Sequence, residues 1–350
     1  MHPSIIKLLS EGCVIPAHPL ALTPELQLDE KHQRLLTRYY LASGAGGVAV
    51  GVHTTQFEIR NPKINLFEKV LLFASDEIDK ASLKRPFIKV AGICGPVEQA
   101  SHEAELAVKY GYHLGLLSQG GLAGFSESEL IKRAETISNI IPLFGFYLQP
   151  AAGGRTLSYE FWRDFVEIPN VHAIKIAAFN RYQTLDVVRA TCHSNRRNEI
   201  ALYTGNDDNL VADLITPYQF LVNEEKIEKR FVGGLLGHWS VWTKKAVELL
   251  NEIKVCVTDG YAGSEKLLAK GIEVTDMNAA IFDAKNNFKG CIPGIHEILR
   301  RQGLLQGRWC LNREEELSEG QMNEIERILK SYPHLTDDGF VKGFLEEEGV

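Results

Sequence analysis

The chain has 350 residues, of which 45% are hydrophobic and 24% are charged, and its formal net charge is -7 at pH 7. This length suffices for one large domain, or for one domain with an appendage. The acidic balance argues against a nucleic-acid partner, because such a partner requires a basic face. No run approaches the roughly 18 apolar residues of a membrane span, and the first residues lack the apolar core of a secretory signal. We therefore expect a soluble, cytoplasmic protein.

Apolar strand-like runs alternate with amphipathic runs from residue 13 to residue 255. The short apolar runs, which a parallel sheet would bury on both faces, cover residues 13–17, 47–52, 87–94, 113–118, 143–149, 173–178, 200–204 and 231–237. The amphipathic runs that predict helices cover residues 29–43, 96–110, 127–140, 159–165, 184–191 and 241–253. Eight strand units predict an α/β protein, a (β/α)8 TIM barrel formed by residues 1–255. A doubly wound open sheet is the alternative, and the absence of a glycine-rich dinucleotide turn disfavours it.

Beyond residue 255 the pattern predicts helices without strands, over residues 264–270, 275–286, 294–302 and 318–331. Residues 256–350 are therefore predicted to form a C-terminal helical extension that packs on the barrel or on a neighbouring subunit. The acidic segment 336–350 is expected to be loosely held. The six cysteines form no C-x-x-C pair, and we expect free thiols rather than a zinc site or disulfides.

Lys175 is the most informative residue, because it stands within the apolar strand of residues 171–179. Side chains alternate along a strand, so Lys175 shares a face with the small residues Ala173 and Ala177. A lysine is rarely buried without a partner or a task. Burial lowers the pKa of an amine, and a neutral amine attacks carbonyl carbons. Lys175 is thus a candidate Schiff-base lysine, with a salt bridge to Asp207 as the alternative.

In a barrel of this type the active site lies at the carboxyl ends of the strands. Tyr147 is predicted to point inward beside Lys175, with Phe144 and Phe146 packing outward on the helices. A phenol beside such a lysine can relay protons. The alternative is a core tyrosine whose hydroxyl bonds to the main chain.

Thr54 and Thr55 end the second predicted strand. Their hydroxyls and the neighbouring main-chain N–H groups suit the carboxylate of a small acid. Ordinary β-branched residues at the end of a strand are the alternative.

These motifs, in this order and spacing, resemble the dihydrodipicolinate synthase and N-acetylneuraminate lyase family, which comprises pyruvate-dependent class I aldolases and hydro-lyases on a (β/α)8 barrel. Tyr147 and Pro150 are similar to the tyrosine-x-x-proline of that family, and Lys175 lies on a segment similar to its Schiff-base strand. The other similar segments are residues 13–29, 44–58, 204–207 and 278–329. The resemblance thus covers nearly the whole chain.

The resemblance implies that Lys175 forms an imine with a 2-oxo acid such as pyruvate, and that Tyr147 moves protons. It also implies that Thr54 and Thr55 hold the substrate carboxylate. No metal or organic cofactor is required, and a homo-dimer or homo-tetramer of barrels is expected.

The departures from the family pattern fall at the position of the second substrate. The usual threonine on strand one is replaced by His18, and the arginine that some members place after strand five is missing. These differences argue against dihydrodipicolinate synthesis itself. His53, Asn206 and His238 are predicted to face a rebuilt pocket, with one histidine acting as a general acid or base. Histidines satisfied by main-chain groups are the alternative.

The sequence therefore favours a Schiff-base-forming lyase, a class I aldolase or hydro-lyase, acting on a 2-oxo acid or a sugar-acid derivative. One alternative is a barrel that has lost catalysis and binds a small carboxylate. A metal-dependent hydrolase using His18, His53, Asp207 and His238 ranks last, because the spacings typical of metal ligands are absent.

Overall fold

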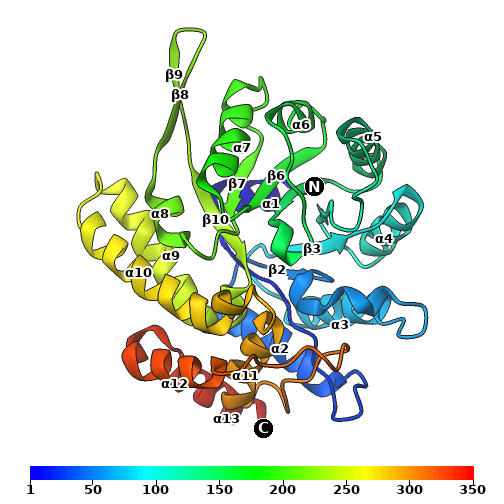
Figure 1. Cartoon of the computed structure of the whole chain (residues 1–350), viewed down its shortest axis with the longest axis vertical. Coiled ribbons are helices and arrows are strands. Elements are labelled where there is room, and N and C mark those ends of the chain that lie inside the picture. The colour runs from blue at the N-terminus through cyan, green and yellow to red at the C-terminus, as the bar shows by residue number, and fades with distance from the viewer.

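A barrel of eight parallel strands forms the centre of the computed structural model, which describes all 350 residues (Figure 1). The strands are β1 (Val14–Pro16), β2 (Gly47–Val50), β3 (Ile88–Ile93), β4 (Leu114–Leu117), β5 (Leu143–Leu148), β6 (Val171–Ala177), β7 (Ala201–Thr204) and β10 (Phe231–Leu236). Their order is β1-β10-β7-β6-β5-β4-β3-β2, and a parallel bridge between Ala17 and Ala49 brings the two edges together. The predicted (β/α)8 barrel is confirmed.

Helices cover the outer face of the barrel, because apolar side chains on that face need a second layer to leave water. They are α2 (Glu30–Ser43), α3 (Phe67–Lys80), α4 (Val97–Lys109), α5 (Glu127–Ser138), α6 (Tyr159–Phe165), α7 (Arg181–His193), α8 (Leu210–Ile215) and α9 (Thr243–Thr258). The sequence interpretation omitted α3, which buries Val70 and Leu71 against the barrel. No helix of the structure combines the length and the apolar character that crossing a membrane requires.

A short helix, α1 (Pro3–Glu11), was not predicted, and it contributes side chains to the core inside the barrel. Its Ile5 and Leu9 belong to the core cluster that fills the barrel, and the Tyr203 hydroxyl donates to the Leu9 carbonyl at 2.9 Å. Proline is favoured at the first helical position, and here Pro3 begins the helix. Pro3 was the sequence feature that could have indicated this helix. A nine-residue helix with two buried positions shows little hydrophobic periodicity.

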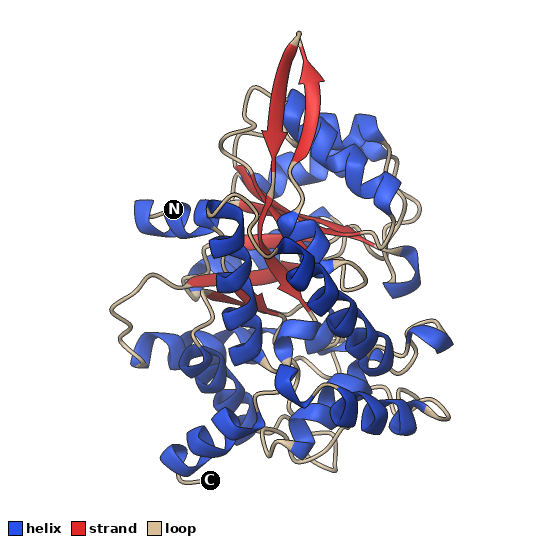
Figure 2. Cartoon of the chain, turned by 90° about the vertical axis from the view of Figure 1, so that its left-hand side faces the viewer, coloured by secondary structure: helices blue, strands red, loops and turns tan.

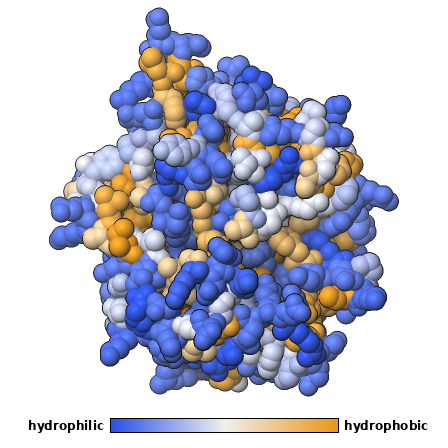
Figure 3. Space-filling view, viewed as in Figure 1, coloured by the Kyte–Doolittle hydropathy of each residue, from blue (hydrophilic) through white to orange (hydrophobic).

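An antiparallel hairpin interrupts the last barrel unit, and it too was missed. Strands β8 (Tyr218–Val222) and β9 (Glu225–Lys229) extend away from the body of the molecule (Figures 1 and 2). Its turn uses Asn223 and Glu224 with φ of 49° and 68°, a left-handed pair that hairpin turns require and that asparagine tolerates. The face shown in Figure 3 is mostly hydrophilic, with apolar atoms along this hairpin, where Leu221 is 70% exposed.

The C-terminal residues form four further helices beside the barrel mouth. They are α10 (Ser264–Ile281), α11 (Cys291–Arg301), α12 (Gln321–Ser331) and α13 (Asp338–Glu348). Helix α10 is continuous where two separate segments were expected. The expectation that residues 336–350 are loosely held is wrong, because α13 buries Val341 and Phe344.

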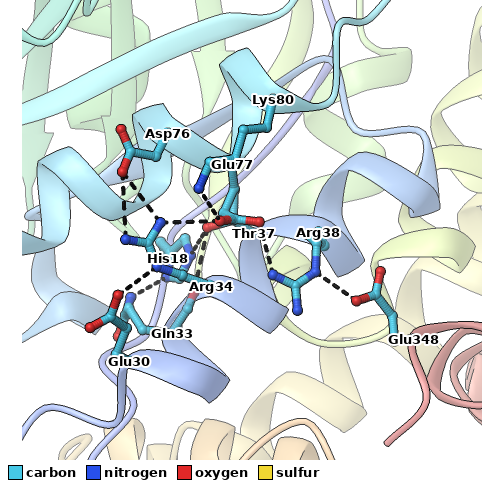
Figure 4. A network of polar contacts seen from close by, with 10 residues as sticks. All are labelled: His18, Glu30, Gln33, Arg34, Thr37, Arg38, Asp76, Glu77, Lys80 and Glu348. Carbon is cyan, nitrogen blue, oxygen red and sulfur yellow. Dashed lines mark hydrogen bonds and ion pairs between the residues drawn. The ribbon is translucent and has the colours of Figure 1, made fainter.

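Charged side chains join α13 to the barrel helices (Figure 4). Arg38 of α2 pairs with Glu77 of α3 at 2.8 Å and with Glu348 of α13 at 2.7 Å. Arg34, one turn earlier, pairs with the same Glu77 at 3.1 Å. Exposed pairs contribute little singly, but Glu77 is buried and fixed by two arginines. The network therefore joins α2 to α3, and its Arg38–Glu348 pair extends it to α13.

Asp337, just before α13, fastens the C-terminal segment to the barrel from inside. Its Oδ2 accepts hydrogen bonds from the Tyr39 hydroxyl at 2.6 Å and from the Lys244 N–H at 3.1 Å. Its Oδ1 accepts from Gln302 Nε2 at 2.9 Å. One buried carboxylate thus accepts hydrogen bonds from α2, from α9 and from Gln302, the residue that follows α11.

We expect Asp337→Ala to lower the free energy of unfolding by about 3 kcal/mol, because it leaves buried donors of Tyr39 and Lys244 without acceptors. Urea denaturation measures the change. Glu347→Gln, at an exposed site of α13, is the control and should change stability by less than about 0.5 kcal/mol. Equal stabilities of the two variants would contradict the fastening role.

Candidate active site

Lys175 lies on the inner face of β6, where the strand alternation predicts it. Ala173 and Ala177 share that face inside the barrel, while Ile174 and Ile176 pack in the outer core. The lysine side chain extends past Gly205 on the neighbouring strand unit. A Cβ at residue 205 would lie 2.6 Å from Lys175 Cε, so glycine is needed for the lysine to occupy this position.

The lysine opens into a cavity of about 100 Å³ at the carboxyl ends of the strands. This space admits several water molecules and is well below the several hundred Å³ of sites for drug-sized ligands. Strands contribute Phe146, Leu148 and Ala177 to its wall, and the C-terminal segment contributes Phe282 and Phe288. The polar side chains that line it are those of Lys175, His53, Thr54, Gln149, Asp207 and Cys291.

The Lys175 amine is buried and lies 4.5 Å from the centroid of the Phe146 ring. Burial lowers the pKa of this amine below its ordinary value, and the charge of Asp207 opposes the shift. Lys175 forms no salt bridge, so the alternative of a lysine held in contact with Asp207 is not what the structure shows. An amine with a lowered pKa and open space before it is suited to attack a carbonyl.

Asp207 follows β7 and lines the same cavity. Its Oδ1 accepts a hydrogen bond from the His238 main-chain N–H at 3.4 Å. Burial raises the pKa of the carboxyl, and the nearby Lys175 charge opposes the shift. Each partner of this pair thus favours the other's charged form, while burial favours both neutral forms.

His53 and Thr54 form another part of the cavity wall, on the turn after β2. The His53 side chain makes no hydrogen bond to the protein, and burial lowers its pKa to about 4, so it is neutral near pH 7. The Thr54 hydroxyl donates to the Ala17 carbonyl at 2.8 Å. The Thr55 hydroxyl donates to the His18 carbonyl at 2.7 Å and does not line the cavity. Both hydroxyls therefore hold the turn against strand one.

Tyr147 points away from the cavity, and the inward orientation predicted for it is wrong. Its ring packs on Trp162 of α6 with centroids 5.2 Å apart, and its hydroxyl accepts from the Leu157 N–H at 3.2 Å. Phe144 and Phe146, predicted to face outward, fill the barrel instead. All six residues of β5 are apolar or aromatic, so their pattern does not identify the inner face. The alternative of a core tyrosine bonded to the main chain is what the structure shows.

Asn206 and His238 also lie outside the cavity, contrary to the sequence interpretation. Asn206 accepts from the Phe179 N–H at 3.0 Å and donates to Asp213 at 2.9 Å, so it joins the loop after β6 to α8. His238 lines a separate, smaller cavity with Val274 of α10. Burial lowers the pKa of His238 to about 4. Its main-chain N–H, rather than its imidazole, contributes to the site.

The residues proposed for a metal-dependent hydrolase are not arranged as ligands. His18 is bonded to the Pro19 carbonyl at 2.8 Å and to the Thr37 hydroxyl at 2.9 Å, within the network of Figure 4. The structure contains no group of three or more histidine, cysteine, aspartate or glutamate side chains placed to hold a metal ion. The geometry therefore gives this alternative no support.

Sequence reasoning missed the apolar wall of the cavity. Phe146 was assigned to the wrong face of β5, and Phe282, Phe288 and Ile295 come from the segment after residue 255. No local pattern marks these residues as wall, because their position depends on how α10 and α11 dock. Glycine at residue 205 was an available signal, since it follows a strand directly beside the lysine strand.

Comparison with known proteins gives structural matches and no sequence matches. No protein-family model and no curated protein sequence matches the chain. A dihydrodipicolinate synthase from Oceanobacillus iheyensis superposes with a TM-score of 0.73 at 18% identity, over 94% of this chain and 99% of that one. An N-acetylneuraminate lyase from Fusobacterium nucleatum gives 0.70 at 17% identity, over 92% and 99%. Its complex with pyruvate gives 0.68 at 16% identity, over 93% and 99%.

The predicted resemblance in fold is thereby confirmed. At these identities the likeness establishes the shared barrel with its C-terminal helices, and a shared fold does not by itself imply a shared reaction.

We expect Gly205→Ala to lower the free energy of unfolding by about 1–3 kcal/mol, because its new Cβ would overlap Lys175 Cε. Gly124→Ala, where a Cβ would meet nothing within 4 Å, is the control and should stay within about 0.5 kcal/mol of the wild type. Thermal and urea unfolding measure both. A Gly205→Ala protein as stable as the wild type would show that the lysine is seated differently.

Proposed function

We propose that this protein is a Schiff-base-forming lyase, a class I aldolase or hydro-lyase, that acts on a small 2-oxo acid such as pyruvate. The observation that carries the proposal is Lys175, which is buried without a salt bridge and opens into a cavity at the strand ends. The shared fold with a lyase and a synthase, whose names state their activities, agrees with this class.

An imine at Lys175 would act as an electron sink. Its positively charged nitrogen accepts the electron pair released when a bond at the carbon next to the former carbonyl breaks. The same intermediate serves cleavage of a carbon–carbon bond or loss of a hydroxyl group. The cavity volume of about 100 Å³ favours a short 2-oxo acid over an extended sugar acid.

The substrate carboxylate would lie at the turn that carries His53 and Thr54. Both threonine hydroxyls donate to carbonyls, so the carboxylate needs other donors. The neutral imidazole of His53 offers one N–H, and main-chain N–H groups of the turn are further candidates. Lys175 is the one cationic side chain that lines the cavity. Thr55 is assigned the role of holding the turn.

A binding protein without catalysis is the second candidate function, and one observation favours it. Tyr147, the proton relay implied by the family resemblance, is directed at Trp162 rather than at the lysine. A barrel that lost its relay and kept its cavity would still bind a small carbonyl acid.

The decisive experiment is intact mass after incubation with pyruvate and sodium borohydride. We expect a reduced adduct on the wild type and none on Lys175→Ala. Lys229→Ala is a matched control, because burial also lowers the pKa of Lys229, to about 8. Lys229 lies on strand β9 of the hairpin and does not line the cavity. Absence of an adduct with pyruvate and with other 2-oxo acids would favour the binding protein.

Tyr147→Phe is expected to leave the rate of adduct formation within about twofold of the wild type, because the hydroxyl bonds only to Leu157. Its stability should fall by about 1 kcal/mol through loss of that hydrogen bond. Borohydride trapping and urea unfolding measure the two effects. A large loss of trapping with unchanged stability would restore Tyr147 as the relay.

The homo-dimer or homo-tetramer, the cytoplasmic location and the independence from cofactors stay predictions. Light scattering of the purified protein determines the first of these.

A further inference from the structure

We propose that Asp207 is the acid–base residue of this site and transfers the protons of imine formation in the place that a tyrosine would otherwise fill. The inference rests on the proposed function, because it assigns a proton carrier to the imine at Lys175. It follows from which groups line the cavity and from what each of them already bonds to.

Few groups in the cavity wall can exchange a proton. Besides Lys175, the titratable side chains that line it are His53, Asp207 and Cys291. Burial raises the pKa of the Cys291 thiol far above its ordinary value, and burial lowers that of His53 to about 4. A proton carrier works best when its pKa lies near the working pH. Burial raises the pKa of the Asp207 carboxyl from its ordinary acidic value toward neutral pH.

The position of Asp207 suits the role. Strands β6 and β7 are direct neighbours, with Lys175 in register with Tyr203, and Gly205 contacts the lysine stem. Asp207 follows two residues later and reaches the same cavity. Its Oδ1 is oriented by the His238 N–H, whereas its Oδ2 accepts no hydrogen bond from the protein. One oxygen is therefore fixed and the other is free for a reacting group.

The lysine and the carboxyl together hold the protons that imine formation needs. In the neutral pair, the Lys175 nitrogen attacks the carbonyl carbon, and the carbonyl π electrons move to oxygen. That oxygen takes the Asp207 proton, and the carboxylate takes one proton from nitrogen, which gives a neutral carbinolamine. Asp207 then protonates the hydroxyl, the C–O bond breaks, water leaves, and the nitrogen lone pair forms the C=N bond. An iminium beside a carboxylate remains, with every proton accounted for.

The carboxylate left by this step is also placed for the reverse transfer. In an aldol cleavage it would take the proton of the substrate hydroxyl while the carbon–carbon bond electrons move toward the iminium. An aldehyde leaves and a neutral enamine remains beside the protonated Asp207. That proton can return to the enamine carbon, which restores the iminium and the carboxylate. No oxidant, reductant or metal enters the balance.

The test measures the rate of imine formation with pyruvate. Protein and pyruvate are mixed, the reaction is quenched with borohydride at short times, and the reduced adduct is quantified by intact-mass spectrometry. We expect Asp207→Asn to slow adduct formation by about a hundredfold or more. The asparagine oxygen can still accept from the His238 N–H, so this variant is expected to fold. Asp208→Asn removes the same charge one residue on, at an exposed position outside the cavity wall, and should leave the rate within about twofold.

A second variant separates chemistry from structure. Asp207→Ala should be equally slow and should regain at least about tenfold in rate when formate is added, because a small acid can occupy the vacated space and carry the proton. Rescue by formate would not follow from a merely structural role.

The outcomes distinguish the two proposals. Wild-type protein that forms no adduct with any 2-oxo acid overturns both. Wild-type protein that forms the adduct, together with Asp207→Asn at the same rate, overturns the role of Asp207 and leaves the imine chemistry standing. Slow adduct formation in Asp207→Ala with no gain from formate also overturns the role, because the loss would then reflect a distorted cavity.

Discussion

Desolvation of a single amine is the constraint on which this site depends. Lys175 can be neutral near physiological pH only if the barrel keeps its ammonium form out of water, and each neighbour contributes to that. Ala173 and Ala177 leave space around the side chain, the absence of a Cβ at Gly205 leaves room for its stem, and the Phe146 ring lies 4.5 Å from its amine. Asp207, the one acidic neighbour in the wall, limits how far the pKa falls. The balance between burial and this carboxyl determines whether the pair holds its protons as an ion pair or as two neutral groups.

The enclosure is completed by backbone that adopts unfavourable conformations. Phe179 and Phe288 have φ of 49° and 65°, in the left-handed region that residues with bulky side chains rarely adopt. Their rings meet edge to face with centroids 5.7 Å apart, and both line the cavity. Strain of this kind persists where the surrounding structure over-determines it. Two hydrogen bonds hold the neighbouring backbone. The Phe179 N–H donates to the Asn206 side-chain oxygen, and the Gly290 N–H donates to the Asp283 carboxylate.

The sequence determines the barrel and the lysine more clearly than the rest of the site. Apolar runs of fixed spacing predict the eight strands, and the small residues around Lys175 identify its inner face. Strand β5 was assigned the wrong inner face, because its residues are apolar on both faces and alternation alone does not say which set points inward. The hairpin around Asn223 and the walls supplied by α10 and α11 depend on tertiary packing, which no short pattern records. His238 was placed correctly at a strand end, yet its ring turns toward α10.

The cavity draws its wall from both the barrel and the last quarter of the chain, which has a consequence for biosynthesis. Chains leave the ribosome from the N-terminus, so β1 through β10 emerge before Phe282 and Phe288 exist. A nascent barrel at that stage already holds Lys175 but leaves it open to water, where an amine stays protonated and reacts poorly with the carbonyl compounds of the cell. The desolvation of Lys175 therefore depends on residues that are translated after every strand of the barrel, and it is complete only when the segment from α10 to α11 has docked.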